Sequence, residues 1–161
     1  MRPEVAFFIA AAACARDVPS ATVGHRDQAL IDRLPAAMRA RVDEASVVVL
    51  LPREISLERA HLVTEKTYSA LSVPLPGLTV SLHSARIAHR YDGVDAASAG
   101  AARPMRGTVG YTTVNEGIRT ATWIDGGIAH ALDLECADPT DARCADDTLL
   151  LDLVESLGAT R

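Results

Sequence analysis

The sequence between residues 118 and 134 most constrains the fold, because it joins two β-prone runs through a tight-turn sequence. The first run contains the only tryptophan, Trp123, the turn is Asp125-Gly126-Gly127, and the second run reaches Leu134. Asp-Gly and Gly-Gly pairs supply the positive φ angles that short hairpin turns need. We therefore predict a β-hairpin in this part of the chain.

The length of the hairpin loop decides which side chains are buried. A loop of two residues places six side chains on one face of the sheet: Ala121, Trp123, Ile128, His130, Leu132 and Leu134. A loop of three residues places Ile118 and Ile124 there instead. We favour the shorter loop, because it buries the only tryptophan. In both registers His130 has apolar neighbours, which indicates a hydrogen-bonded core histidine rather than a catalytic one.

Two cysteines, Cys136 and Cys144, follow the hairpin and flank a short, turn-rich insert. Such an insert can bring its ends together, so we predict a disulfide. The alternatives are a metal site, which the spacing does not favour, and two free thiols of a cytosolic protein. A C-terminal helix should follow, capped by Asp146 and ended by Gly158. Its inner face should consist of Leu150, Leu153, Val154 and Leu157.

The first fifteen residues resemble a secretory signal peptide. An apolar run extends from Val5 to Ala13, which is too short to span a membrane. Cleavage before Cys14 would leave a lipid-anchored cysteine, as in bacterial lipoproteins, although Ala11 stands where those signals usually have leucine. Cleavage after Ala15 would release a secreted protein. We expect a signal peptide at 1–15, a polar tether at 16–26 and one domain at 27–161; a buried N-terminal helix of a cytosolic protein is the alternative.

The middle of the chain predicts alternating helices and strands. Apolar spacing in 27–44 indicates helix, interrupted by Pro35 into two short helices or a kink. Residues 46–51 form a continuous apolar run, typical of a buried central strand. Strands are expected at about 78–91 and at 108–114, separated by a flexible loop at 94–106 that is rich in Ala, Ser and Gly.

Residues 56–70 are expected to form a helix that Ser56 caps. At helical spacing Glu58, His61 and Glu65 fall on one arc, which also includes Glu54. They form the one cluster that suggests metal binding or acid–base chemistry, but a charged stripe on an otherwise apolar helix is normally a solvated face, and we prefer that interpretation. The arginines Arg26, Arg33, Arg39 and Arg41 are likewise read as a solvated face, with contact to anionic headgroups as the alternative.

The composition excludes some functions. The formal net charge of the 161 residues is −5, so the chain lacks the basic footprint of a nucleic-acid-binding protein. Motifs for phosphate loops, dinucleotide binding, the serine-hydrolase elbow and zinc proteases are absent from the sequence. We therefore assign no catalytic residue, no metal ligand and no cofactor.

The closing pattern of strand, Asp-Gly-Gly turn, strand and helix resembles the end of several bacterial envelope modules. These are small exported lipoproteins related to the extrinsic subunit of the photosynthetic oxygen-evolving complex, and the periplasmic lipoprotein-carrier and sigma-factor-regulator domains. The resemblance covers residues 118–157 and carries over no functional residue. It implies a binding role towards a partner protein, a lipid or a hydrophobic ligand.

Together these features predict an α+β fold, with a single antiparallel sheet of about five strands packed by helices and a C-terminal helix. The expected function is that of an exported, lipid-anchored envelope protein that binds an envelope partner or a small apolar ligand without catalysis. A hydrolase or metal-dependent enzyme and a structural or regulatory component of a cell-surface complex are the alternatives.

Overall fold

The computed structural model describes residues 26–86 and 100–161. The expected signal peptide, Cys14 and residues 16–25 of the tether lie outside the described residues. So do the end of the expected strand at 78–91 and residues 94–99 of the expected loop.

The first two elements are short helices that meet at Pro35, as the sequence predicts. Helix α1 covers Gln28–Asp32 and helix α2 covers Ala36–Glu44. The side chain of Asp27 caps α1 by accepting a hydrogen bond from the amide of Leu30 at 3.1 Å. Proline has no amide hydrogen and cannot continue the first helix, so the chain turns there and starts a second one.

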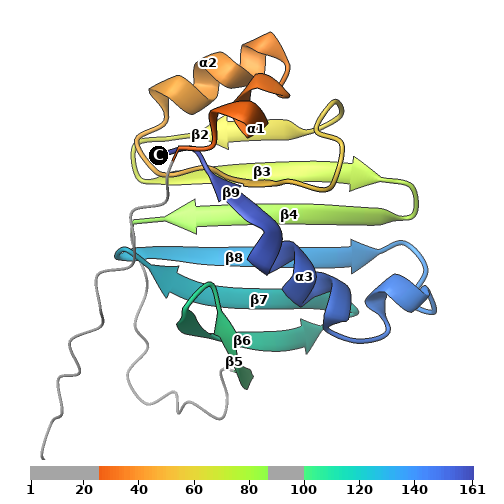
Figure 1. Cartoon of the computed structure of the whole chain (residues 1–161). Helices are drawn as coiled ribbons and strands as arrows, with labels where there is room; N and C mark the ends of the chain where they lie inside the picture. Colours follow the sequence, from red (N-terminus) through yellow and green to blue (C-terminus); the bar gives the residue numbers. More distant parts are fainter. Residues whose placement is uncertain (1–25, 87–99) are drawn as a thin grey trace, which may run out of the picture.

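The expectation of a single sheet of about five strands is wrong. The described chain is mostly β, with a seven-stranded antiparallel sheet in the order β2-β3-β4-β8-β7-β6-β5 and a separate pair, β1-β9 (Figure 1). The strands of the large sheet are β2 (His61–Thr64), β3 (Tyr68–Leu75), β4 (Leu78–Ala85), β5 (Ala101–Met105), β6 (Thr108–Asn115), β7 (Ile118–Asp125) and β8 (Ile128–Cys136).

The helix expected at 56–70 does not form, and its residues belong to a loop and to strands β2 and β3. Ser56 accepts a bond from the amide of Glu58 at 3.4 Å, but the chain then extends. Ser69, Leu71 and Val73 are buried while the residues between them are not. This period of two belongs to a strand, and here it overrode the helical spacing of the acidic residues.

The strand expected at 46–51 is buried, but it is not central to the large sheet. Strand β1 (Leu50–Pro52) pairs only with β9 (Leu157–Ala159). The expected loop at 94–106 is also partly wrong, because Ala101–Met105 pairs with β6 as an edge strand. An apolar run shows that a segment is buried, and it does not show which strand is its partner.

The hairpin at the centre of the sequence argument is confirmed in its shorter register. Asp125 pairs with Ile128, and Gly126 and Gly127 form the two-residue turn, both with positive φ. Trp123 therefore pairs with His130, and Ala121 with Leu132, on the buried face.

The C-terminal helix α3 covers Thr148–Ser156. Asp147 occupies its N-cap position without a side-chain capping bond, while the carboxylate of Asp146 accepts a hydrogen bond from the amide of Thr148 at 2.8 Å. Leu150, Leu153 and Val154 are buried as expected, but Leu157 and Gly158 belong to strand β9. Gly158 is needed for close packing, since a Cβ there would lie 2.6 Å from the Leu30 side chain of α1.

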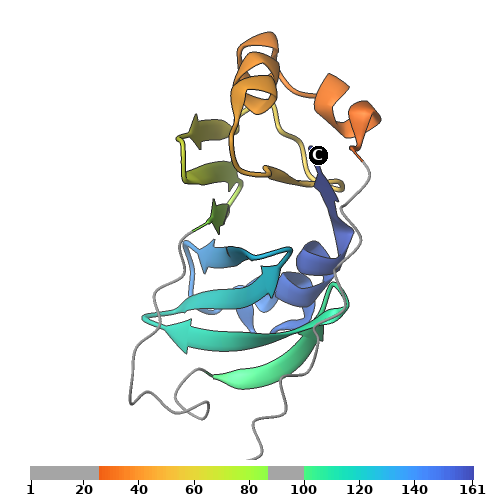
Figure 2. The same ribbon diagram turned by 90° about the vertical axis from the view of Figure 1, so that its left-hand side faces the viewer.

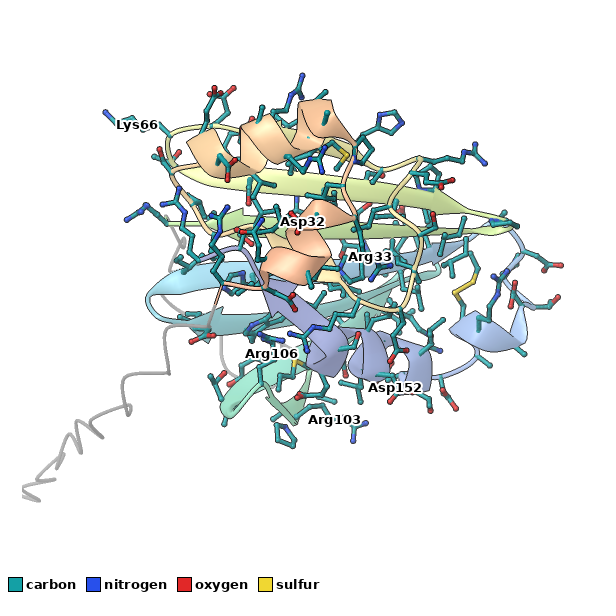
Figure 3. The ribbon with its side chains drawn as sticks, turned by 45° about the horizontal axis from the view of Figure 1, so that its top comes forward. Asp32, Arg33, Lys66, Arg103, Arg106 and Asp152 are labelled. Atoms are coloured by element: carbon teal, nitrogen blue, oxygen red, sulfur yellow. A yellow bond between two sulfur atoms is a disulfide. The ribbon has the colours of Figure 1, made fainter. Side chains whose placement is uncertain are left out.

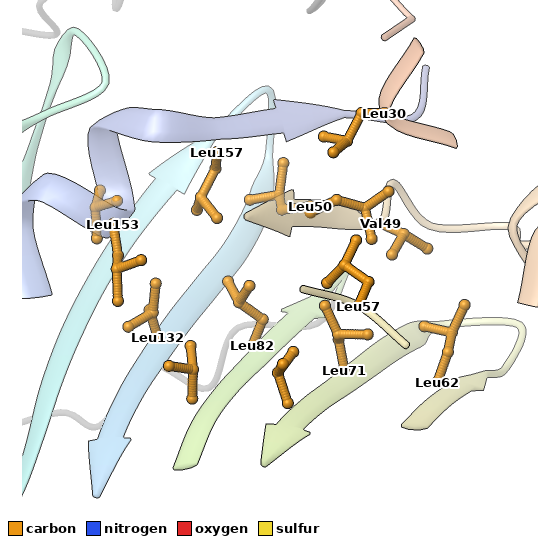
Figure 4. Packing of buried hydrophobic residues seen from close by; sticks show 14 of the residues in the cluster. Leu30, Val49, Leu50, Leu57, Leu62, Leu71, Leu82, Leu132, Leu153 and Leu157 are labelled. Atoms are coloured by element: carbon orange, nitrogen blue, oxygen red, sulfur yellow. The ribbon is translucent and has the colours of Figure 1, made fainter. Parts of the chain in front are cut away.

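The described helices cover one face of the large sheet or lie along its edge. Helix α1, helix α3 and the β1-β9 pair lie over one face, and α2 lies against edge strand β2 (Figure 2). Between these layers, leucines of β1, β9 and α3 meet leucines of β2, β3, β4 and β8 (Figure 4). The large sheet therefore has a covered face, which forms the core, and an open face.

Candidate functional site

The open face of the large sheet is the strongest candidate for a binding surface. It consists of the side chains that alternate with the buried ones along each strand. No described helix packs on it (Figure 2). Its residues are mostly small, and the pairing register aligns one transverse set of them across β3 to β7. We call this set the outer row: Tyr68, Ala85, Ala129 and Ile124, extended on β6 and β5 by the pair Val109 and Pro104.

Exposed apolar side chains concentrate on this face. Five large hydrophobic residues are exposed among the described residues: Val63, Tyr68, Val109, Val114 and Ile124. The register places all of them except Val114 on the open face, because Val114 pairs with inward-facing Arg119. Val109 and Ile124 retain 66% and 57% of their accessible surface. A cluster of this kind on a sheet face is a recognised mark of an interaction site.

The charged groups of the open face are few. Asp133 accepts a hydrogen bond from the hydroxyl of Thr120 at 2.6 Å, and the Nε2 atom of His83 lies 3.8 Å from the same carboxylate. On the described strands, the alternation places no lysine or arginine side chain on this face. The open face is therefore weakly acidic around Asp133 and apolar along the outer row.

The covered face holds a second cluster, built around His130. The Oγ atom of Ser84 lies 2.9 Å from Nδ1 of His130, and the Trp123 ring stacks on the imidazole with ring centroids 5.2 Å apart. All three side chains are buried. Burial and, to a smaller extent, the nearby charge of Arg106 lower the pKa of His130 to about 4, so the imidazole is neutral at pH 7.

This arrangement confirms His130 as a hydrogen-bonded core histidine. A serine–histidine pair is also the start of a hydrolytic site, but catalysis needs a nucleophile that a substrate can reach. Ser84 and His130 are 3% and 5% exposed. Their burial gives a substrate carbonyl no access to the hydroxyl, so the pair does not favour a hydrolase.

The polar cluster proposed from sequence is not brought together on one helix. Glu58 lies in the loop before β2, His61 begins β2, and Glu65 follows its end. All three are exposed. Among the described residues no group of three or more His, Cys, Asp or Glu side chains is placed to hold a metal ion.

Cys136 and Cys144 form a disulfide, with Cα atoms 6.2 Å apart. It joins the end of β8 to the short 3-10 helix η2 (Ala142–Cys144), which precedes α3. Arg119 supports the same junction by donating to the carbonyls of Cys144 and Ala145, each at 2.6 Å, and to Asp147. The sequence therefore predicted the bridge and its location correctly.

The four arginines near the start of the domain bind the protein itself. Arg33 donates to the carbonyls of Arg53 and Ile55, Arg41 to that of Leu62, Arg26 to that of Thr160, and Arg39 to that of Asp32. The sequence reading of a solvated face missed these contacts, because arginine–carbonyl contacts between distant segments leave no local pattern.

The outer row was within reach of the sequence but was not identified there. Because neighbouring residues of a strand face opposite sides, Ile124 must face outwards once Trp123 faces inwards. The same alternation turns Val109 outwards, since its neighbour Gly110 pairs with Trp123. An apolar residue on the outward side of two adjacent strands was the available signal.

In the described part of the chain, no helix has the length and apolar character to cross a bilayer. No protein-family model, curated protein or solved structure matches this chain. The resemblance of residues 118–157 to envelope modules accordingly stays a prediction.

Proposed function

We propose that this chain is an exported, non-enzymatic envelope protein that binds a partner protein through the open face of its large sheet. The observation that carries the proposal is the gathering of Val63, Tyr68, Val109 and Ile124 on the one sheet face that no described helix covers. A protein that left this face in water would expose apolar area with no compensating gain.

The dimensions of the face suit a protein partner. Seven strands at about 4.8 Å spacing make a surface roughly 30 Å wide, and the strands of eight residues run roughly 26 Å across it. This is close to the area of about 800 Å² that each partner contributes to a standard protein interface. The lack of basic side chains disfavours anionic lipid headgroups and nucleic acid as the occupant.

Export is supported by the disulfide, because such bridges persist mainly in oxidising compartments. The apolar N-terminal run supplies the signal in this proposal. Cleavage before Cys14 would add a lipid anchor that holds the domain on a membrane surface and concentrates it near envelope partners. The polar tether at 16–26 would then separate the lipid from the domain.

A photo-crosslinking amino acid at position 124, in the native cell envelope, tests the binding face. We expect a discrete adduct with another protein, and we expect Val109→Asp to abolish it. The captured protein, once purified, should bind the wild-type domain directly. Ile124→Asp should weaken that binding at least tenfold, because it places a charge within the apolar outer row.

Val114 provides the matched control, since it is exposed to the same 57% as Ile124 but is not on the open face. Val114→Asp should leave binding unchanged, and a crosslinker at 114 should not give the adduct. Equal adducts from 114 and 124, or an adduct of twice the mass of this chain, would contradict the proposed partner. The intact mass of the mature protein tests export: a chain that retains Met1 with reduced thiols would refute it.

A further inference from the structure

The carboxylate of Asp133 lies near the centre of the open face. Strand β8 is the fourth of the seven strands in the large sheet, and Asp133 is the sixth of its nine residues. Its neighbours Leu132 and Leu134 are buried in the core, so alternation turns Asp133 onto the open face. There it pairs with Ser81 of β4 on one side and with Thr120 of β7 on the other.

The negative charge at this position has no permanent counter-charge among the described residues of the face. The hydroxyl of Thr120 donates to Oδ1 of Asp133 at 2.6 Å, and 31% of the Asp133 side chain stays exposed. Nε2 of His83 lies 3.8 Å from Oδ2, which is too far for a hydrogen bond. Glu135, two residues further along β8, is exposed on the same face and adds a second negative charge. The described strands place no lysine or arginine side chain there.

The outer row is close enough to Asp133 for one partner to cover both. Asp133 lies four residues along β8 from Ala129 of the outer row, which is about 13 Å at the rise of a strand. A standard interface of about 800 Å² on each partner is roughly 28 Å across, so a partner seated on the outer row reaches the Asp133 carboxylate. Removing a carboxylate from water is costly unless a positive group takes the place of that water.

We propose that the partner protein presents a lysine or arginine side chain that pairs with Asp133, beside apolar side chains that cover the outer row. This inference rests on the proposed function and names the chemistry of the partner at the same face. The apolar contacts supply buried area, and the ion pair fixes the orientation of the partner on the sheet. A neutral or acidic partner surface is disfavoured, because it would bury the Asp133 charge without a counter-charge.

Titration calorimetry of the Asp133→Asn domain with the purified protein captured through position 124 tests the inference. Asparagine has nearly the same shape, keeps an acceptor for Thr120 and removes the charge. We expect the affinity to fall at least tenfold, because the basic side chain of the partner would be buried without its counter-charge. The affinity of the variant should also depend less on salt concentration than that of the wild type.

Asp152→Asn is the matched control, since Asp152 is an exposed carboxylate on α3, away from the open face (Figure 3). It should leave the affinity unchanged, and equal midpoints of thermal unfolding should show that both variants keep the fold. Asp133→Asn binding that is as tight as the wild type, or tighter, overturns the inference, because a neutral partner surface gains when the charge is removed. If Ile124→Asp still weakens that binding, the proposed function stands; if neither variant changes it, both proposals are wrong.

Discussion

His130 shows how a titratable side chain is tolerated in the core. The imidazole accepts or donates one hydrogen bond at Nδ1 with Ser84 and lies flat against Trp123. Removal from water disfavours its charged form, which is why its pKa falls to about 4. The same side chain is therefore compatible with the core at neutral pH and incompatible with it in acid.

His130 should make the stability of the domain fall between pH 6.5 and pH 4. Its pKa is lower in the folded protein than the ordinary 6.5, so the unfolded chain binds the proton more tightly and acid favours unfolding. Its full contribution is present above pH 6.5 and is lost as the pH falls to 4, a loss of about 3 kcal/mol. Urea unfolding midpoints across this range measure it.

His130→Gln keeps a hydrogen-bonding group beside Ser84 but does not titrate, so its stability should change much less across the same window. His83→Gln on the open face serves as the control and should keep the wild-type acid sensitivity. Asp141, whose pKa is lowered to about 2 by Arg143, titrates below this window. An equal loss of stability in His130→Gln would show that another group is responsible.

At the scale of the elements, the two edges of the large sheet are protected in different ways. Edge strand β2 is covered by α2, and Arg41 of that helix donates to the Leu62 carbonyl at 2.6 Å. On the other edge, β5 is protected by Pro104. Met105 and Thr108 close a two-residue hairpin turn, so Ala102 and Pro104 direct their backbone groups away from β6. Proline there removes an outward donor at no cost to the sheet.

Pro104→Thr should therefore promote edge-to-edge association, because it restores an outward amide on an exposed strand. We expect sedimentation velocity to detect dimers or larger species of the variant at concentrations where the sedimentation coefficient of the wild type does not change. Val109→Thr, on the adjacent strand, changes the surface without adding an edge donor and is the control. Unchanged sedimentation of Pro104→Thr would mean that β5 is protected by something other than proline.

How well the sequence predicted each element depended on whether its determinants were local. The kink at Pro35, the turn at Gly126 and Gly127, and the Cys136–Cys144 bridge depend on neighbouring residues and were predicted correctly. Strands β2 and β3 were mistaken for a helix, because Glu58, His61 and Glu65 match a helical period and their strand partners are distant. For the same reason the prediction that these three side chains share one face of a helix was wrong.

At the scale of the whole molecule, the covered face is fastened by long-range contacts from arginine and by one covalent bridge. Lys66 is the only lysine among sixteen basic residues, so the positive charge is almost entirely arginine. Arg106 and Arg119 bind carbonyls at the two ends of α3, and the disulfide anchors the segment before it. Composition showed the excess of arginine, but only the fold shows that it connects segments.

The double variant Cys136→Ser with Cys144→Ser should unfold more easily than the wild type. A bridge that closes so short a loop contributes about 2.5 kcal/mol by restricting the unfolded chain. In a domain of this size the loss should lower the midpoint of thermal unfolding by roughly 5–10 °C. A reductant should lower the wild-type midpoint to the same value and leave the variant unaffected; a reductant-insensitive wild type would contradict the bridge.

The start of the described chain is bound directly to its end. The amide of Asp27 donates to the carbonyl of Ala159 at 2.9 Å, and Val49 exchanges hydrogen bonds with Thr160. During synthesis, β1 thus has no strand partner, and the amide of Asp27 has no acceptor, until residues 157–160 have emerged from the ribosome. The late arrival of β9 delays closure of this layer, so ribosome-stalled chains that lack residues 157–160 should remain open to protease within 26–52.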